Sequence, residues 1–519
     1  MITKIYSAIP LGYDGRIIEV EASLTKGLPA FNLVGMGDKT IAESRDRVRS
    51  AIQNSDLTFP ARKTTVNLAP ANLIKTGSSL DLPIAIAILS ASNQLNFHDI
   101  SQKLFVGELS LSGEIRPVHG IINIIEAAKH IGLSEVFLPS ENINSASIIQ
   151  GIKLFPVRNL KQLFLHLKHQ ISIPPTPPQS TLLQPTQEST LNPITLNQIY
   201  GQPFAKRALI LSLSGHHNLL LTGPPGSGKT MLAKAIPSLL SAPSPLEILE
   251  IAKINELSHE PLKSISRPFR TPHHSSSSCA IIGGGTPIVP GEISLAHQGV
   301  LFLDELPEFS RQVLESLRQP LEDRQITISR TKEKVTFPAN FILVATMNPC
   351  PCGFYDNKIR PCTCSNHQIQ NYQKKISGPI LDRFDLKVTV PYLGNQKIIE
   401  QFKNQKDVTQ SSIPPTAPSP HPQTHDSVKK AIQATLDLQT SRYHSPSIYN
   451  GTLTATQISH FIHLDHSSQK HLELASEKLH LSTRSLLKII RLSRTIADLE
   501  SAPEIQVHHL SEAISFNQP

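Results

Sequence analysis

The stretch NLLLTGPPGSGKT (218–230) has the residue types and spacing that bind a nucleoside triphosphate. It matches the P-loop pattern, in which an apolar strand leads into a glycine-rich loop and then a helix, and the complete pattern disfavours a purely structural turn. The glycines let backbone N–H groups surround the phosphates, Lys229 places its charge at the β- and γ-phosphates, and the Thr230 hydroxyl can bind Mg²⁺. The expected nucleotide contacts are Gly223, Pro224, Pro225, Gly226, Ser227, Gly228, Lys229 and Thr230.

Two further apolar runs end in polar residues that could complete a hydrolytic site. Val300–Leu303 leads into Asp304 and Glu305, and the run 341–349 contains Asn348 near its end. If both runs are parallel strands, these side chains lie at the carboxyl edge of the sheet, where open α/β sheets bind ligands. Asp304 would then support Mg²⁺, Glu305 would orient and polarise the attacking water, and Asn348 could bond the water and a γ-phosphate oxygen. The alternative for the acidic pair is a solvated turn.

Four of the five cysteines form a second candidate site, with the spacing C-x-C, nine residues, C-x-C: Cys350, Cys352, Cys362 and Cys364. Four thiolates in two pairs can surround one Zn²⁺ and close a loop that has no core of its own. All four thiols would be used, which leaves no coordination position for a substrate. We therefore expect a structural zinc site, with paired disulfides or free thiols as the alternatives.

Two proline-rich stretches, 171–193 and 396–425, are expected to be extended linkers that divide the 519 residues into three blocks. Block 1–170 mixes strand-like and helix-like runs. Block 194–395 alternates short apolar strands with helical stretches, which indicates a parallel sheet flanked by helices. Block 426–519 has apolar residues at three- and four-residue spacing and is expected to be helical.

The composition permits a nucleic-acid partner and argues against a membrane protein. The formal net charge is +8, and no uninterrupted apolar run reaches the ~18 residues of a membrane span. No signal peptide is evident, so a cytoplasmic location is expected. With no tryptophan and eight tyrosines, extensive stacking on bases is not expected, and contact with the backbone is favoured.

The segment 321–341 alternates apolar and polar residues on both sides of a basic turn, as a β-hairpin does. Its cations, which could touch a nucleic-acid backbone, are Arg330, Lys332 and Lys334. An ordinary solvated turn is the alternative. The glycine-rich loop 281–292 is a second candidate for contact with a substrate, and flexibility alone explains it equally well.

The order of the P-loop, LFLDE, ATMNP and LDRFD resembles an AAA+ ATPase, and the stretch 267–309 resembles the magnesium-chelatase-like branch. Over essentially its whole length the chain is similar to the ComM/YifB family, which is associated with helicase and branch-migration activity in natural transformation. The resemblance implies an AAA+ P-loop α/β core with a helix-2 insert and a hairpin before the sensor-1 strand, followed by an α-helical lid. The hairpin would point into a central pore.

The resemblance also assigns roles to three residues outside the main motifs. Arg383 is similar to the arginine finger and Arg484 to the sensor-2 arginine, both able to act on a neighbouring subunit, and Gln202 would lie near the adenine. From the residues alone, Arg383 could equally be paired with its neighbours Asp382 and Asp385. A finger supplied by a neighbour requires an oligomer, so the family implies a ring, expected to be a hexamer.

The stretch 73–89 in the first block resembles the proteolytic domain of Lon, an α+β fold of the S5-like type that uses a Ser–Lys dyad. Ser79 stands at the position of the nucleophile, but Ile122 replaces the lysine, and no lysine occurs from 104 to 128. We therefore expect a Lon-like scaffold without peptidase activity, which could bind DNA or a partner or help ring assembly. A partly basic helix face there, for which solvated surface is the favoured interpretation, carries Arg45, Arg47 and Arg49.

The resemblance to the ComM/YifB family implies an ATP-hydrolysing ring motor that uses Mg²⁺ and moves along single- or double-stranded DNA without sequence preference, driving branch migration during recombination of incoming DNA. Recombination proteins are expected as further partners. The alternative is a chelatase-type motor subunit that remodels a partner protein. An ATP-dependent protease is a third interpretation, which Ile122 argues against.

Overall fold

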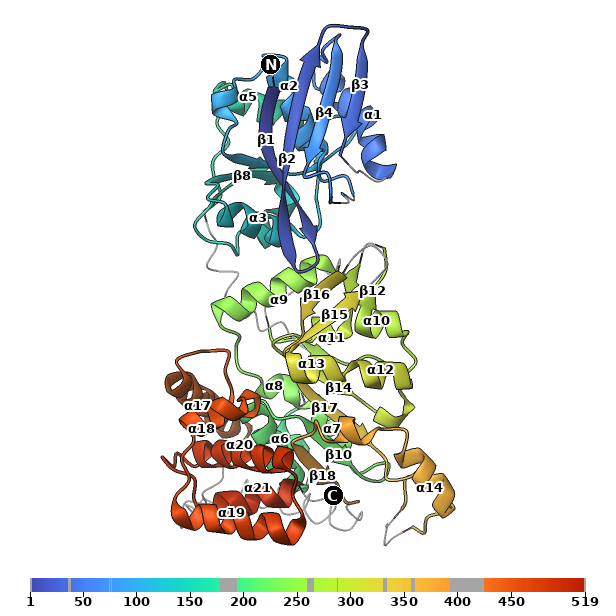
Figure 1. Cartoon of the computed structure of the whole chain (residues 1–519), viewed down its shortest axis with the longest axis vertical. Coiled ribbons are helices and arrows are strands. Elements are labelled where there is room, and N and C mark those ends of the chain that lie inside the picture. The colour runs from blue at the N-terminus through green and yellow to red at the C-terminus, as the bar shows by residue number, and fades with distance from the viewer. Residues whose placement is uncertain are drawn as a thin grey trace, which may run out of the picture.

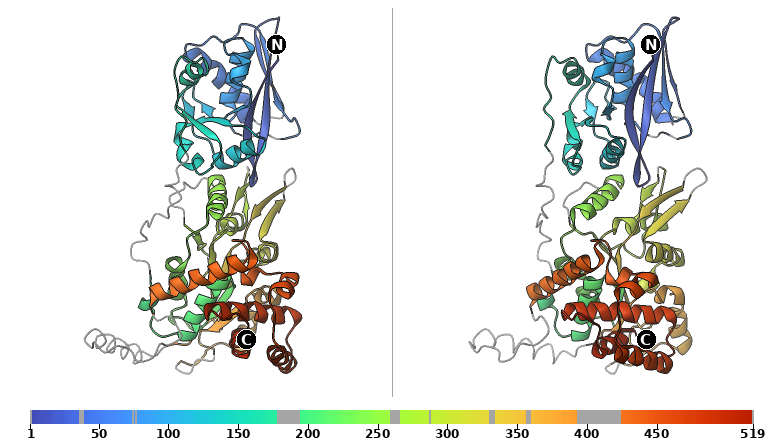
Figure 2. Two further views of the ribbon diagram at one scale, coloured as in Figure 1. Left: turned by 90° about the vertical axis from the view of Figure 1, so that its left-hand side faces the viewer. Right: turned by 60° about the vertical axis from the view of Figure 1, so that its left-hand side comes forward.

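Figure 1 shows the chain as three blocks, with the N-terminal block at one end and the C-terminal helices beside the middle block. Figure 2 shows the same arrangement from two other sides. The computed structural model describes residues 2–35, 39–73, 75, 77–177, 194–258, 266–286, 288–329, 334–355, 360–392 and 424–517. Most of both expected linkers lies outside these residues, so the domain boundaries stay predictions.

The first block is built on a seven-stranded mixed sheet with the order β3-β4-β2-β1-β5-β8-β9. Its strands are β1 (Ile2–Leu11), β2 (Asp14–Thr25), β3 (Ala30–Val34), β4 (Lys63–Ala69), β5 (Lys103–Phe105), β8 (Glu135–Pro139) and β9 (Lys153–Val157). A small hairpin pairs β6 (Glu108–Leu109) with β7 (Ile115–Arg116). The helices are α1 (Lys39–Asn54), α2 (Asp81–Ala91), α3 (Ile121–His130), α4 (Ile143–Ala146) and α5 (Leu160–Leu167).

Helix α2 forms the centre of the first block, because all eleven of its residues are buried. Its buried Asp81 needs a partner, and Arg47 of α1 supplies one through Nε at 2.8 Å. Arg47 is therefore held inside this contact and is not part of a solvated basic face. Arg45 and Arg49 are exposed. The start of the first expected linker also packs here, since Ile173 is buried and Thr176 forms a bridge with Leu154.

The second block contains a five-stranded sheet in which every strand pair is parallel, with the order β11-β14-β17-β10-β18. These strands are β10 (Leu219–Thr222), β11 (Phe269–Arg270), β14 (Val300–Leu303), β17 (Ile342–Met347) and β18 (Leu386–Thr389). Two hairpins stand apart from the sheet and pair β12 (Gly283–Gly284) with β13 (Val289–Pro290) and β15 (Gln325–Ser329) with β16 (Lys334–Pro338). The parallel sheet predicted from alternating strands and helices is confirmed.

Helices of the second block lie on both sides of this sheet (Figure 1). They are α6 (Pro203–Gly215), α7 (Lys229–Lys234), α8 (Ile236–Leu239), α9 (Pro245–Leu257), α10 (Ser278–Ile282), α11 (Glu292–Leu295), α12 (Arg311–Ser316), α13 (Arg318–Asp323), α14 (Asn366–Gln373) and α15 (Gly378–Leu381). The third block is helical as predicted, with α17 (His425–Tyr443), α18 (Ala455–Phe461), α19 (His466–Leu479), α20 (Thr483–Leu499) and α21 (Val507–Asn517). Leu209 of α6, Ile432 of α17 and Ile496 of α20 share one apolar core, so the helical block is packed onto the sheet block.

The first and second blocks meet along helix α9, which packs against α3 (Figure 1). Ile248 and Ala252 of α9 join a core cluster made otherwise of first-block residues. Lys253 of the same helix is nearly fully buried; its Nζ bonds Glu126 of α3 and lies 3.9 Å from the centre of the Tyr13 ring.

The turn between β1 and β2 extends this contact to the β15–β16 hairpin. A Cβ placed on Gly12 would come within 2.6 Å of Cγ1 of Val335 in β16. Since Gly12 also has a φ of +60°, both the backbone and the close approach favour glycine at this position. The first block therefore touches the hairpin for which the sequence predicts a role in DNA contact.

Candidate active site

The P-loop follows β10 and ends where α7 begins. Gly226 and Gly228 have φ angles of +76° and +92°, and a Cβ on either would meet nothing within 4 Å. The requirement for glycine is thus conformational, because only glycine adopts these backbone angles without strain. Ser227 Oγ is buried and has no hydrogen-bond partner among the described residues, so it is a donor available to a ligand.

Lys229 connects the P-loop to the end of the neighbouring strand. Its buried Nζ donates to the carbonyl oxygens of Gly223 at 2.7 Å and Pro224 at 2.9 Å, and to Oδ1 of Asn348 at 3.2 Å. Burial lowers the pKa of Lys229 to about 8, and the carboxylates of Asp304 and Glu305 act in the opposite direction. The structure therefore brings these sequence-predicted residues to one edge of the sheet, next to each other.

Asp304 and Glu305 follow β14 at the same edge. Thr230 Oγ1 lies 3.2 Å from Oδ2 of Asp304, which places the two expected Mg²⁺ ligands together. Thr346 of β17 also donates to Asp304, and its Oγ1 accepts from the backbone N–H of Glu305 at 3.1 Å. Glu305 is exposed with a φ of +54°, an uncommon backbone conformation for a residue with a side chain. Thr346 was not singled out from the sequence.

Gln202 lies beside the P-loop at the start of α6. Its buried side-chain amide donates to the carbonyl oxygens of Pro391 at 2.6 Å and Ser227 at 3.3 Å. These contacts fix the backbone of the P-loop relative to the end of β18. Contact between Gln202 and an adenine ring stays a prediction.

Arg383 and Arg484 converge on one carboxylate. Arg383 is almost fully buried and pairs with Glu322, and Nη2 of Arg484 lies 3.5 Å from the same Oε1 atom of Glu322. Asp385 accepts instead from the backbone N–H of Asn218 at 3.0 Å. The structure thus brings Arg383 and Arg484, the two arginines expected to contact phosphate, to the same carboxylate of Glu322. Nothing in the sequence indicated a role for this glutamate.

The four clustered cysteines are brought together as predicted, with all four sulfur atoms within 4.8 Å of one another. Sγ of Cys350 is 3.4 Å from Sγ of Cys352 and 3.7 Å from that of Cys362, and none of the four forms a disulfide. A tetrahedron of sulfurs around Zn²⁺ at ~2.3 Å has S–S separations of about 3.8 Å. Backbone N–H groups of Tyr355 and Cys364 donate to the sulfurs of Cys350 and Cys362, respectively. The donor set and its spacing fit zinc.

The cysteine loop is packed against the P-loop. Gly353 has a φ of +82°, and a Cβ at this position would lie 2.5 Å from Cδ of Pro225. Only glycine fits both the backbone angle and the approach. The loop that the cysteines close therefore supports one side of the phosphate-binding loop.

The hairpin expected from the alternation in 321–341 is formed by β15 and β16, with Ile326 opposite Phe337 and Ser329 opposite Lys334. Lys334 is exposed. Arg330 and Lys332 lie outside the described residues, so their predicted role is not addressed by the structure.

Three family models match separate parts of the chain. The model described as "Magnesium chelatase, subunit ChlI" matches residues 195–398. "Subunit ChlI of Mg-chelatase" matches 20–142, and "Magnesium chelatase, subunit ChlI C-terminal" matches 423–517. The middle block with its P-loop and parallel sheet is thus a magnesium-chelatase-like AAA+ domain.

Two relatives are similar over nearly the full length. Competence protein ComM of Haemophilus influenzae is 41% identical over 525 residues, which cover 99% of this chain and 96% of that protein. The uncharacterized protein YifB of Escherichia coli is 40% identical over 523 residues, with coverages of 99% and 97%. The chain belongs to the ComM/YifB family. None of the helices in the described part of this family member combines the length and apolar character needed to cross a bilayer.

The first block of this ComM/YifB-family chain is also similar to a Lon protease. The protein from Leptospira interrogans is 30% identical over 161 residues, which cover 30% of this chain and 19% of that protein. Ser79 is half-buried, and Ile122 of α3 is fully buried. An apolar side chain such as that of Ile122 cannot act as the base that activates a hydroxyl.

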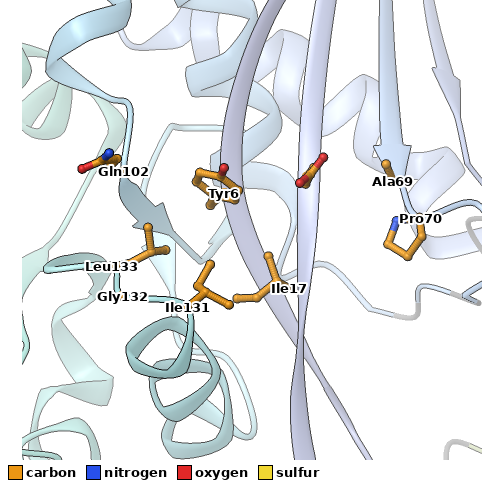
Figure 3. A pocket seen from close by; sticks show the side chains of 9 residues that line it. Tyr6, Ile17, Ala69, Pro70, Gln102, Ile131, Gly132 and Leu133 are labelled. Carbon is orange, nitrogen blue, oxygen red and sulfur yellow. The ribbon is translucent and has the colours of Figure 1, made fainter.

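A pocket of about 690 Å³ opens in the first block between β1, β2 and the end of α3. Figure 3 shows Tyr6 of β1 above Ile131 and Leu133, with Ile17 of β2 beside Ile131. The described lining residues include no serine, cysteine or lysine, so among them the pocket offers neither member of a Ser–Lys dyad.

Proposed function

We propose that the chain is an ATP-hydrolysing ring motor that moves along DNA and drives branch migration while incoming DNA recombines in natural transformation. The observation that carries the proposal is the meeting of Lys229, Thr230, Asp304, Glu305 and Asn348 at the carboxyl ends of three adjacent parallel strands. This is the place at which open α/β sheets bind and process nucleotides.

The site can perform hydrolysis through positioning and charge. Lys229 and the P-loop N–H groups would hold the phosphates, while Thr230 and Asp304 would hold Mg²⁺, which neutralises phosphate charge when bound. Glu305 is exposed and close to this pair, so its carboxylate can accept a proton from an attacking water. Asn348 is within hydrogen-bond distance of Lys229 and can orient the same water.

The subunit arrangement proposed is a ring, with six members as the expected number. Its support is the pairing of Arg383 and Arg484 with Glu322, which places both guanidinium groups in one pocket formed by the sheet block and the lid. In a ring they would act on the nucleotide of the neighbouring subunit, where a finger arginine is worth ~10³–10⁵ in rate.

DNA is the proposed track, and the cytoplasm is the proposed location. The support is the net charge of +8, the separate β15–β16 hairpin with its exposed Lys334, and a relative whose printed name is competence protein. Arg330 and Lys332, which lie between these two strands in the sequence, are proposed to share the contact. Recombination proteins are proposed partners on the same grounds.

A branch-migration assay on a synthetic four-way junction tests the proposal. The wild-type chain should move the junction only when ATP is present, and Lys229→Ala should lower ATP hydrolysis by about 10²–10³-fold and stop the movement, because the phosphates lose their buried cation. Lys234→Ala is the matched control, since Lys234 is exposed in the same helix α7. ATP hydrolysis without any action on DNA would contradict the proposed DNA motor and favour a chelatase-type motor that remodels a protein.

We further propose that the four clustered cysteines hold a structural Zn²⁺. Elemental analysis should find about one zinc per purified chain, and the double variant Cys350→Ser/Cys352→Ser should retain less than about one tenth of it. ATP hydrolysis should fall in the same variant, because the loop packs on Pro225 of the P-loop. Cys279→Ser changes the exposed fifth cysteine and should keep the zinc. A wild-type chain that is purified without zinc would end this hypothesis.

A further inference from the structure

The pocket that holds Arg383 and Arg484 carries an unbalanced positive charge. It has a volume of about 400 Å³ and lies between the end of α13, the start of β18 and the lid helix α20. Its cationic side chains are Arg324, Arg383, Arg484, Lys488 and Arg491. Its carboxylates are Glu322 and Asp385, so five cations face two anions. Such a pocket favours an added anion.

Two donors in this pocket are unsatisfied. The Nε atoms of Arg383 and Arg491 are buried without a hydrogen-bond partner among the described residues. Nη1 of Arg383 donates to the carbonyl oxygen of Pro379, but an Nε–H group buried without a partner is costly, and a polyanion with several oxygen atoms would satisfy both Nε atoms. The neighbouring subunit's nucleotide is the anion that the proposed function supplies.

The backbone on both sides of Arg383 is held by the lid. Lys488 of α20 donates from Nζ to the carbonyl oxygens of Asp382 and of Phe384, the second at 2.8 Å. Burial lowers the pKa of Lys488 to about 8. Because the backbone is fixed in this way, the guanidinium of Arg383 can change partner by side-chain rotation while its Cα stays in place.

Glu322 is the partner that is easiest to release. Its side chain is 51% exposed, whereas that of Arg383 is 7% exposed. Arg484, which shares the carboxylate, is also half-exposed. Loss of the ion pair would leave Glu322 in water at little cost. It would leave Arg383 buried with the Pro379 carbonyl oxygen as a partner but without the Glu322 counter-charge unless another anion arrived.

We propose that Glu322 competes with the terminal phosphate of the neighbouring subunit's nucleotide for Arg383 and Arg484. This inference rests on the proposed function, because it requires the two arginines to act across a subunit contact. Glu322 keeps both arginines paired within one subunit, and subunit association exchanges its carboxylate for a phosphate. Carboxylate and phosphate oxygens both match the guanidinium fork, which makes the exchange chemically direct. The glutamate therefore sets the subunit concentration at which hydrolysis begins.

The test is the DNA-free ATPase rate of the full-length chain at saturating ATP, measured against protein concentration. Glu322→Gln keeps the shape of the side chain and removes its charge, so the protein concentration for half-maximal rate per subunit should fall about threefold to tenfold. The rate at high protein concentration should stay within about twofold of wild type. Asp323→Asn removes the adjacent exposed carboxylate and should leave the curve unchanged.

Structural damage cannot imitate the expected result, because damage would move the half-maximal concentration upward. An unchanged or raised half-maximal concentration for Glu322→Gln, at an unchanged melting temperature, would overturn the inference alone. A wild-type chain without ATP hydrolysis at any concentration, both with and without junction DNA, would overturn the proposed function together with it. If Glu322→Gln lowers the half-maximal protein concentration as expected but the wild-type chain does not act on DNA, the competition between Glu322 and the phosphate is supported. Only the proposed DNA motor is then contradicted.

Discussion

Glu305→Gln is expected to slow ATP hydrolysis by about 10²–10⁴-fold while leaving nucleotide affinity close to that of wild type. The amide retains the size of the side chain but cannot accept a proton from water. Thr230 and Asp304, which would hold Mg²⁺, contact each other directly. This contact does not involve the Glu305 side chain, so the variant should still bind nucleotide. Steady-state ATPase rates and titration with a fluorescent ATP analogue give the two quantities.

Glu308→Gln is the matched control for this variant. Glu308 lies three residues further on, is exposed and pairs with Lys375 at 3.2 Å. Its replacement should change the rate by less than about twofold, because exposed ion pairs contribute little. If Glu305→Gln hydrolysed ATP at the wild-type rate, the base would have to be sought elsewhere at this sheet edge.

Arg383→Ala is expected to lower the ATPase rate by about 10³-fold, since the buried guanidinium is the group placed to stabilise charge on a neighbour's γ-phosphate. Glu322, its partner, is half-exposed, so its release into water should cost little folding stability. Arg318→Ala, which removes an exposed arginine from the same region, should keep the wild-type rate.

Mixing inactive variants shows whether the arginine acts across subunits. Rings formed from equal amounts of Glu305→Gln and Arg383→Ala chains contain contacts in which an intact Glu305 site meets an intact Arg383 of the next subunit. In a head-to-tail ring about one quarter of the contacts are of this kind, so about one quarter of the wild-type rate should return. A mixture as inactive as its components would contradict action in trans.

Much of the nucleotide site could be predicted because its signals are local. The P-loop contains its strand, loop and helix within 218–230, and Asp304 and Asn348 each follow an apolar run that proved to be a parallel strand. The carboxyl ends of parallel strands lie at one edge of the sheet, so the topology alone predicts that Asp304, Asn348 and the P-loop lie close together. The cysteine cluster was equally visible, because two C-x-C pairs lie in one short segment.

The residues that were missed depend on contacts between distant parts of the chain. Glu322 meets Arg383 and Arg484 only after α13, the β18 edge and the lid have packed together. Lys488 was missed for the same reason, because it contacts Phe384 only in the folded chain. In the sequence it is one of several cations on an amphipathic helix. Thr346 gave no signal because a threonine inside a strand is ordinary. Arg47 was expected on a basic face, and its buried partner Asp81 lies 34 residues away.

Helix α9 belongs to the AAA+ block in sequence but supplies Ile248 and Ala252 to a core that is otherwise made by the first block. Breaking that core would expose apolar surface on both sides at once, and cooperative units of unfolding are set by such shared burial. The buried Lys253 pairs with the partly exposed Glu126 and would lose this partner if the blocks separated. We therefore expect the first block and the AAA+ sheet to unfold as one cooperative unit, although the stretch 171–193 separates them along the chain.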